Sequence, residues 1–185
     1  MTLTFKQLTN WFIETGANTV SHSKHGYLAH AIGLYNDLKK WDLGEDFARA
    51  GLFHSIYGTQ IFQGFTLPVD RRDEVREMIG EYWERLCYLN CFMLRKTLYD
   101  QWADDKDTYV VSHRETGETW DLDRKTYDDL CTLHLCDWLE QVERSERWDY
   151  ERDSFHNLAK RLEGIAIEAY REVFAREPQS ASSST

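Results

Sequence analysis

The stretch that decides the fold is 48-ARAGLFHSIYGT-59, an apolar segment that carries a single histidine. Small residues in its first half allow a helix to approach its neighbours closely. Helical spacing places His54 on the same side as Phe47 and Ala50, so this imidazole should point into the protein. A buried imidazole needs a hydrogen bond, a charge or a metal ion as its partner. Taken alone, the stretch is explained more simply by a core histidine whose hydrogen bonds are satisfied than by a catalytic histidine.

The composition favours a single helical domain. The chain has 185 residues, which corresponds to one domain and suffices for a sizeable core. Aromatic residues make up 14% of it and there are only two prolines, a balance that favours helices and supplies large apolar anchors. The net charge of -10 argues against non-specific binding to nucleic acid or to an anionic membrane. A local basic pocket or a metal ion would still accept a small anionic substrate.

No targeting or membrane segment is recognisable. Residues 1–16 alternate like an amphipathic helix and lack the basic start and apolar run of a signal peptide. No apolar stretch approaches the ~20 residues of a membrane span. We therefore expect a cytoplasmic protein that acts on a small molecule, with no nucleic-acid or membrane partner and with an oligomeric state that the sequence leaves open. None of the four cysteines has CxxC spacing, so we expect buried free thiols at Cys87, Cys91, Cys131 and Cys136.

Apolar periodicity predicts about seven helices. Asp70 is expected to cap the fourth of them, Gly80 to separate it from the fifth, and Asn90 to mark a kink in the fifth. A polar link at 18–23 and a glycine-containing loop at 57–67 complete the first half. The predicted helices span residues 4–15, 24–40, 45–55, 71–79, 81–99, 124–145 and 150–175.

One β signal interrupts this pattern. Residues 108–114 and 118–122 read as two short strands around a turn that contains Gly117. Two strands alone are not stable, so this hairpin should lie on helices. The predicted fold is therefore an all-α bundle with a small β-hairpin insertion at about 108–122, forming one domain over residues 1–177. The composition of residues 178–185 predicts a disordered tail.

Three polar residues lie on or beside the inward faces of three separate predicted helices: His30, His54 and Asp137. Two neutral imidazoles and one carboxylate are a workable set of ligands for a divalent ion. Whether the three side chains meet in space is open at this point.

The same residues carry a family resemblance. His30, a short helix, 50-AGLFHS-55 and the late acid in 135-LCDWLE-140 resemble the HD superfamily of all-α metal-dependent phosphohydrolases. Within it, residues 50–86 are most similar to the hydrolase domain of enzymes that remove pyrophosphate from the alarmone ppGpp. The chain also resembles small uncharacterised HD-like proteins that carry HS in place of HD and YGT after it. The resemblance covers about residues 22–142 and implies an HD-like bundle, with His30 as first ligand, His54 as motif histidine and Asp137 as final acid.

The departures from the motif leave three outcomes open. The motif aspartate is Ser55 here, and an uncharged hydroxyl cannot replace a carboxylate as ligand. The acidic pair that follows in alarmone hydrolases falls in 57-YGT-59. An Fe²⁺, Mn²⁺ or Zn²⁺ ion could bind the His/His/Asp set, the site could be metal-free with His54 as a general base oriented by Asp137, or the fold could be a binding module without chemistry. Candidates for a fourth ligand are His22, His25 and His134.

Further residues are candidates for catalysis or substrate binding. Glu84, three residues after Glu81, could act in acid–base chemistry, but a solvated helix face is the simpler interpretation. Tyr57 could donate a proton near His54, or it could simply pack. The predicted substrate contacts are Ser55, Arg71, Arg72 and His134. The two arginines could clamp a phosphate or form salt bridges to the acids at 73–77. For His134, a core residue is the simpler interpretation. His113 and His156 are not expected to act.

The predicted function is that of an HD-like enzyme that acts on a small polar metabolite at a His/His/Asp site, by metal-dependent hydrolysis or by oxidation. The alternative is a metal-free protein that uses His54 as acid or base on an organic substrate, or that only binds a ligand. Ser55 separates the two, because hydrolytic metal sites of this type use the missing carboxylate to hold the ion.

Overall fold

A computed structural model describes residues 3–22 and 25–178, with the backbone alone at residues 21, 22 and 25. The side chains of His22 and His25 and the predicted tail after Pro178 thus lie outside the described residues. Over the described part, the fold is mainly helical, with two small antiparallel strand pairs. Its α-helices are α1 (Phe5–Glu14), α2 (Tyr27–Lys40), α3 (Glu45–Phe53), α4 (Arg72–Ile79), α5 (Glu81–Phe92), α6 (Arg95–Tyr99), α7 (Arg124–Ser145), α8 (Arg152–Leu162) and α9 (Gly164–Phe174).

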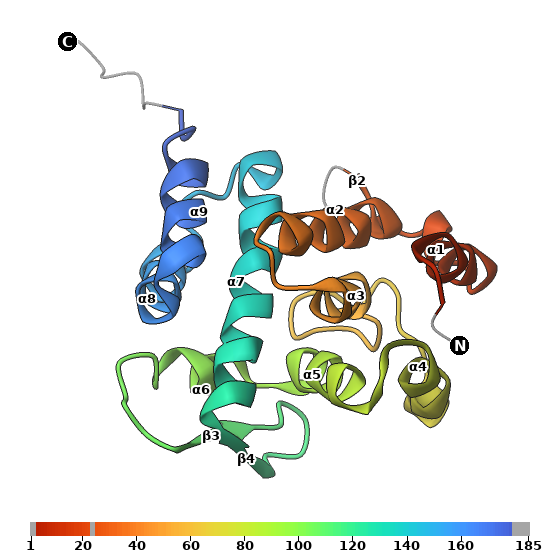
Figure 1. The fold of residues 1–185 in the computed structure, drawn as a ribbon, viewed down its shortest axis with the longest axis horizontal. Helices are drawn as coiled ribbons and strands as arrows, with labels where there is room; N and C mark the ends of the chain where they lie inside the picture. Colours follow the sequence, from red (N-terminus) through yellow and green to blue (C-terminus); the bar gives the residue numbers. More distant parts are fainter. Residues whose placement is uncertain (1–2, 23–24, 179–185) are drawn as a thin grey trace.

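The long helix α7 runs through the middle of the molecule, with α8 and α9 on one side and α2, α3 and α5 on the other (Figure 1). Its bounds are those that the sequence predicts. The Asp123 side chain accepts the Thr126 backbone N–H at 2.7 Å and so caps the first turn of α7. Because α7 contacts both groups of helices, it is buried along much of its length and can bring polar groups into the centre of the fold.

The helices α2 and α3 pack closely because α3 carries a glycine at their contact. A Cβ atom on Gly51 would collide with the Leu38 side chain and would lie 3.3 Å from Leu34 Cγ. The expected close approach at the small residues of 48–51 is thereby confirmed. The helix ends at Phe53, and His54 follows directly as its C-terminal cap residue, held beneath α2.

The predicted hairpin is confirmed as β3 (Thr108–Ser112) paired with β4 (Thr119–Asp123). It lies against α7, where the Tyr109 and Tyr127 rings stack with centroids 4.0 Å apart. The other strand pair, β1 (Ser21–His22) with β2 (His25–Gly26), was not predicted. The pair follows the short 3-10 helix η1 (Ala17–Thr19), and β1 lies in the expected polar link. The strand β2 instead occupies the predicted start of the helix 24–40, so that helix begins only at Tyr27.

Nine α-helices form over the described residues, not about seven, because two predicted helices are broken. The predicted helix 81–99 ends at Phe92, where Met93 turns to extended backbone and pairs with His113 of the hairpin. The break therefore lies three residues after the predicted kink. The predicted helix 150–175 divides at Glu163, which has a φ of 56°. The predicted Asp70 cap is wrong too, because Asp70 lies inside the 3-10 helix η2 (Val69–Arg71) and α4 has no side-chain cap.

All four cysteines are buried and free, as the sequence predicts. No helix among the described residues is long and apolar enough to span a membrane.

Candidate metal centre

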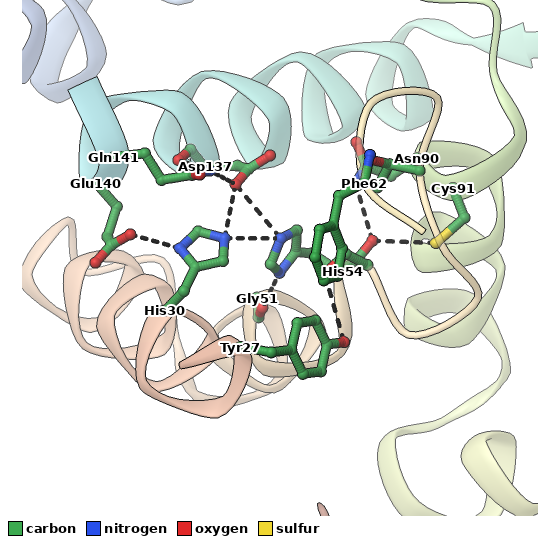
Figure 2. A network of polar contacts seen from close by, with 12 residues as sticks. Tyr27, His30, Gly51, His54, Phe62, Asn90, Cys91, Asp137, Glu140 and Gln141 are labelled. Atoms are coloured by element: carbon green, nitrogen blue, oxygen red, sulfur yellow. Dashed lines mark hydrogen bonds and ion pairs between the residues drawn. The ribbon is translucent and has the colours of Figure 1, made fainter. Parts of the chain in front are cut away.

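Three side chains from three helical segments converge on one point: His30 from α2, His54 from the end of α3 and Asp137 from α7 (Figure 2). The His30 Nε2 and His54 Nε2 atoms lie 3.2 Å apart. Asp137 Oδ1 is 3.0 Å from His30 Nε2 and 3.4 Å from His54 Nε2. All three residues are at least nine-tenths buried. The three predicted ligands therefore meet in space, and the group could hold a metal ion.

The outer nitrogen of each imidazole is held by an acceptor. His54 Nδ1 lies 2.8 Å from the Gly51 carbonyl oxygen, and His30 Nδ1 lies 2.5 Å from a carboxylate oxygen of Glu140. A carbonyl and a carboxylate can only accept, so we assign the hydrogen of each ring to Nδ1. Both Nε2 atoms then present lone pairs to each other and to Asp137. Such a cluster of acceptors needs a cation at its centre, which is either a proton or a metal ion.

The pKa values agree with a site built for positive charge. Burial lowers the pKa of His30, but its hydrogen bonds to the Asp137 and Glu140 carboxylates outweigh burial and raise this pKa to about 9. Burial raises the pKa of Asp137, but the His54 and His30 imidazoles outweigh burial and hold it well below the usual range. Asp137 is therefore ionised at neutral pH, and in the absence of metal the centre retains a proton on His30.

A second layer of contacts holds these ligands in place. Gln141 Nε2 donates to Asp137 Oδ1 at 2.7 Å, and Arg144 forms an ion pair with Glu140. Sequence reasoning missed Glu140, although it lies one helical turn after Asp137 on the same helix. A second signal was Gly33 in the middle of α2, where a Cβ atom would lie 2.9 Å from Glu140 Cδ. Glycine weakens a helix interior, so its presence there indicates a close neighbour.

A cavity of about 370 Å³ opens beside the centre. His54 and Asp137 line it, together with Ser55, whose hydroxyl lies 3.4 Å from the Tyr27 hydroxyl. The volume falls in the range of small-molecule sites. Much of the remaining lining is aromatic or basic: Phe62, Arg95, His134, Trp138, Arg147, Tyr150 and Phe155. A ligand in this cavity would touch two of the three metal-ligand candidates.

The structure does not bring Tyr57 and Glu84 to this cavity. The Tyr57 hydroxyl donates to Glu84 at 2.9 Å, and neither residue lines the cavity. The interpretation of Glu84 as part of a solvated helix face is wrong, because its side chain is fully buried. The reason is a pair of arginines, since Arg72 and Arg76 both donate to its carboxylate and compensate the buried charge.

The two arginines predicted to clamp a phosphate are engaged elsewhere. Arg71 donates to Glu74 at 2.8 Å, as the salt-bridge alternative predicts. Arg72 pairs with the more distant Glu84 and stacks over the Tyr88 ring at 3.7 Å. Neither arginine lines the cavity.

His134 does reach the cavity, but it is not part of the group of three. Its Nε2 lies 2.7 Å from the Tyr99 hydroxyl. The other two histidines with described side chains lie elsewhere. His113 Nδ1 accepts two backbone N–H groups in the hairpin turn, and His156 is exposed and stacks on Tyr170.

Residues 11–95 match the model of a family described as a domain of unknown function (DUF6817). The match runs from α1 to the first residue of α6, so it includes His30 and His54 but not Asp137. No curated protein and no solved structure matches the chain. The residues of the centre are therefore the basis for a functional assignment.

Proposed function

We propose that this protein is an HD-like metal-dependent enzyme that hydrolyses a small polar metabolite at the centre of His30, His54 and Asp137. The observation that carries the proposal is the convergence of two imidazole Nε2 atoms and one carboxylate oxygen, all within 3.4 Å, beside a cavity of about 370 Å³. The three ligands also follow one another along the chain as the HD resemblance implies.

The set of donor atoms fits a transition metal ion. Two imidazoles and one carboxylate are the protein ligands of hydrolytic zinc sites, which leave further coordination positions open. Ser55 contributes no charge, but Glu140 places a second carboxylate on the outer nitrogen of His30. A carboxylate in this position orients the ring and makes its other nitrogen a better ligand. Glu140 thus restores from outside part of the negative charge that the motif aspartate would have supplied.

Each residue of the centre would have its own role in the reaction. A bound divalent ion would supply Lewis-acid activation of a water molecule or of the substrate. Asp137 is held by Gln141 and needs no rearrangement to act as a ligand. The Gly51 carbonyl fixes the ring of His54 in the orientation that aims Nε2 at the centre. The cavity walls would bind the substrate and exclude bulk water.

Oxidation is the second candidate reaction. Two histidines and one carboxylate with open positions are also the ligand set of non-haem iron oxygenases. This reading has the advantage that it does not need the carboxylate lost at Ser55.

The test is metal analysis of protein purified without chelator, comparing the wild type with His54→Ala and with His156→Ala as control. We expect about one transition metal ion per chain in the wild type and in His156→Ala, which alters an exposed ring, and none in His54→Ala. Zinc or manganese would favour hydrolysis, and iron would favour oxidation. If the wild type binds no transition metal even when it is supplied, the proposal is wrong, and His54 as a general base oriented by Asp137 becomes the better description.

A further inference from the structure

Three buried N–H groups near the centre have no acceptor among the described residues. They are Arg95 Nε, Trp138 Nε1 and the Nδ1 atom of His134. All three residues line the cavity. His134 is 1% exposed and Trp138 is 9% exposed, so these nitrogens are shielded from bulk solvent by the fold. A buried donor without an acceptor is destabilising, and three around one cavity indicate a partner that brings acceptor atoms.

The hydrogen on His134 can be assigned from its neighbours. Burial and, to a smaller extent, the nearby charge of Arg95 together lower the pKa of His134 to about 3, so the ring is neutral. Burial raises the pKa of Tyr99, which therefore keeps its proton. Since the Tyr99 hydroxyl has no other acceptor in the described part of the chain, it donates to His134 Nε2 at 2.7 Å. His134 then carries its own hydrogen on Nδ1 and is a donor.

Arg95 adds a positive charge that the chain does not balance. Most arginines of the protein pair with carboxylates, but Arg95 forms no ion pair with any described residue. Its backbone N–H is fixed by Gln60 at 3.0 Å. Its guanidinium is one of two that line the cavity without an ion-pair partner among the described residues, the other being that of Arg147. The Arg95 guanidinium is suited to an anion with two acceptor oxygens.

Two of these donors, His134 and Trp138, lie on the same helix as Asp137 and within one helical turn of it. His134, Asp137, Trp138 and Gln141 share one face of α7, and all four line the cavity. Side chains three or four residues apart on a helix begin about 5–6 Å apart. The Trp138 ring is held by Tyr150 and Phe155, with centroids 5.1 and 5.4 Å away. The donors are therefore rigid and adjoin an apolar aromatic wall.

We infer that Arg95, Trp138 and His134 form the binding site for an oxyanion group of the substrate, whose apolar body lies against Trp138, Tyr150 and Phe155. The inference rests on the proposed function, because it assigns a substrate class to the same cavity. The substrate is thus an organic phosphate or carboxylate whose reacting group reaches Asp137 while its anionic group binds one turn away.

The experiment is calorimetric titration of the purified protein with two probes, phenyl phosphate and benzoate, with metal content measured on the same samples. The variants are Arg95→Met and Trp138→Phe, which remove single donors. The control is Trp148→Phe, because Trp148 is as buried as Trp138 but does not line the cavity. We expect at least one probe to bind, and each donor variant to weaken its binding by about 10- to 100-fold. Metal content should be unchanged in all variants.

The outcomes separate this inference from the proposed function. Binding of phenyl phosphate alone assigns a phosphate, and binding of benzoate alone assigns a carboxylate. If metal is present but neither probe binds, or if the donor variants bind as the wild type does, the inference is overturned and the metal centre stands. If metal is absent but binding depends on Arg95, the proposed function fails and the oxyanion site stands. Should Arg95→Met not fold, Arg95→Lys keeps the charge, loses the Nε donor and should weaken binding by a smaller factor.

Discussion

Two clusters of buried charge lie in this molecule, and they are built in opposite ways. The first is the candidate metal centre of His30, His54 and Asp137. The second, the Glu84 cluster, consists of Glu84 with Tyr57, Arg72 and Arg76. In the Glu84 cluster both carboxylate oxygens accept hydrogen bonds from the arginines, at 2.7 to 3.1 Å, and Tyr57 adds another. In the metal centre the inward atoms are all acceptors.

This difference distinguishes a structural cluster from a functional one better than burial does. Both clusters are buried, and both contain residues that the sequence marks as catalytic candidates. The Glu84 cluster is electrostatically complete with the chain's own donors, so it needs nothing from solution and can serve to anchor α4 on α5. The metal centre is complete only with an added cation. Balance of donors and acceptors is therefore the criterion by which we assign the site.

The strongest test of this contrast is Asp137→Asn, which removes the charge of the centre and keeps its shape. We expect metal affinity to fall by more than about 100-fold, since even contacts beyond the ligands contribute about 10- to 100-fold. Titration with Zn²⁺ against a competing chelator measures this, and circular dichroism checks the fold. A variant that binds metal as the wild type does would show that Asp137 is not a ligand.

The converse test is Glu84→Gln. This substitution leaves Arg72 and Arg76 without their carboxylate, and breaking a buried ion pair costs about 3–5 kcal/mol. The side chains of Arg72 and Arg76 are 23% and 37% exposed, so solvent partly compensates them. We therefore expect the free energy of unfolding by urea to fall by about 3 kcal/mol. Metal content should not change. A stable protein with reduced metal content would instead place Glu84 in the function of the centre.

The sequence identifies the residues of the candidate metal centre because helical periodicity determines which face of a helix is buried. His30, His54 and Asp137 lie on or beside predicted inward faces, and α7 has its predicted bounds. Helical periodicity does not show which residue lies opposite in a tertiary contact. The burial of Glu84 depends on arginines that lie 8 and 12 residues earlier in another helix. The role of Glu140 depends on α2, 110 residues away from it in the chain.

The helix breaks illustrate the same limit. Residues 81–99 have a continuous helical pattern, yet the helix ends because Met93 pairs with His113 in the hairpin. The local pattern at 150–175 is equally continuous, and the turn at Glu163 folds α9 back on α8. Tertiary packing overrides local propensity at both points.

A smaller effect is expected from Glu140→Gln, which keeps the size of the side chain but removes its charge from His30. The ligands remain, so metal should still bind, with affinity lower by about 10- to 100-fold. The matched control is Glu143→Gln on the same helix, since Glu143 pairs with Arg176 in an exposed ion pair. Equal metal affinities of the two variants in the Zn²⁺ titration would contradict the role of Glu140.

A change of pH perturbs the centre without altering any residue, and it should change the metal affinity. Asp137 has a lowered pKa and stays ionised, whereas His30 has a pKa of about 9 in the metal-free protein. Below that pH a proton occupies the centre and must leave when metal binds, so the apparent metal affinity should rise by about tenfold per pH unit and level off above about pH 9.

In Glu140→Gln the His30 imidazole loses one of its two carboxylates, its pKa should fall, and the rise in metal affinity should end at a lower pH. Zn²⁺ titrations at several pH values on both proteins check this, and a flat profile in the wild type would mean that metal does not compete with a proton on His30. The Glu84 cluster provides the reference, because Glu84→Gln should leave the wild-type pH profile unchanged.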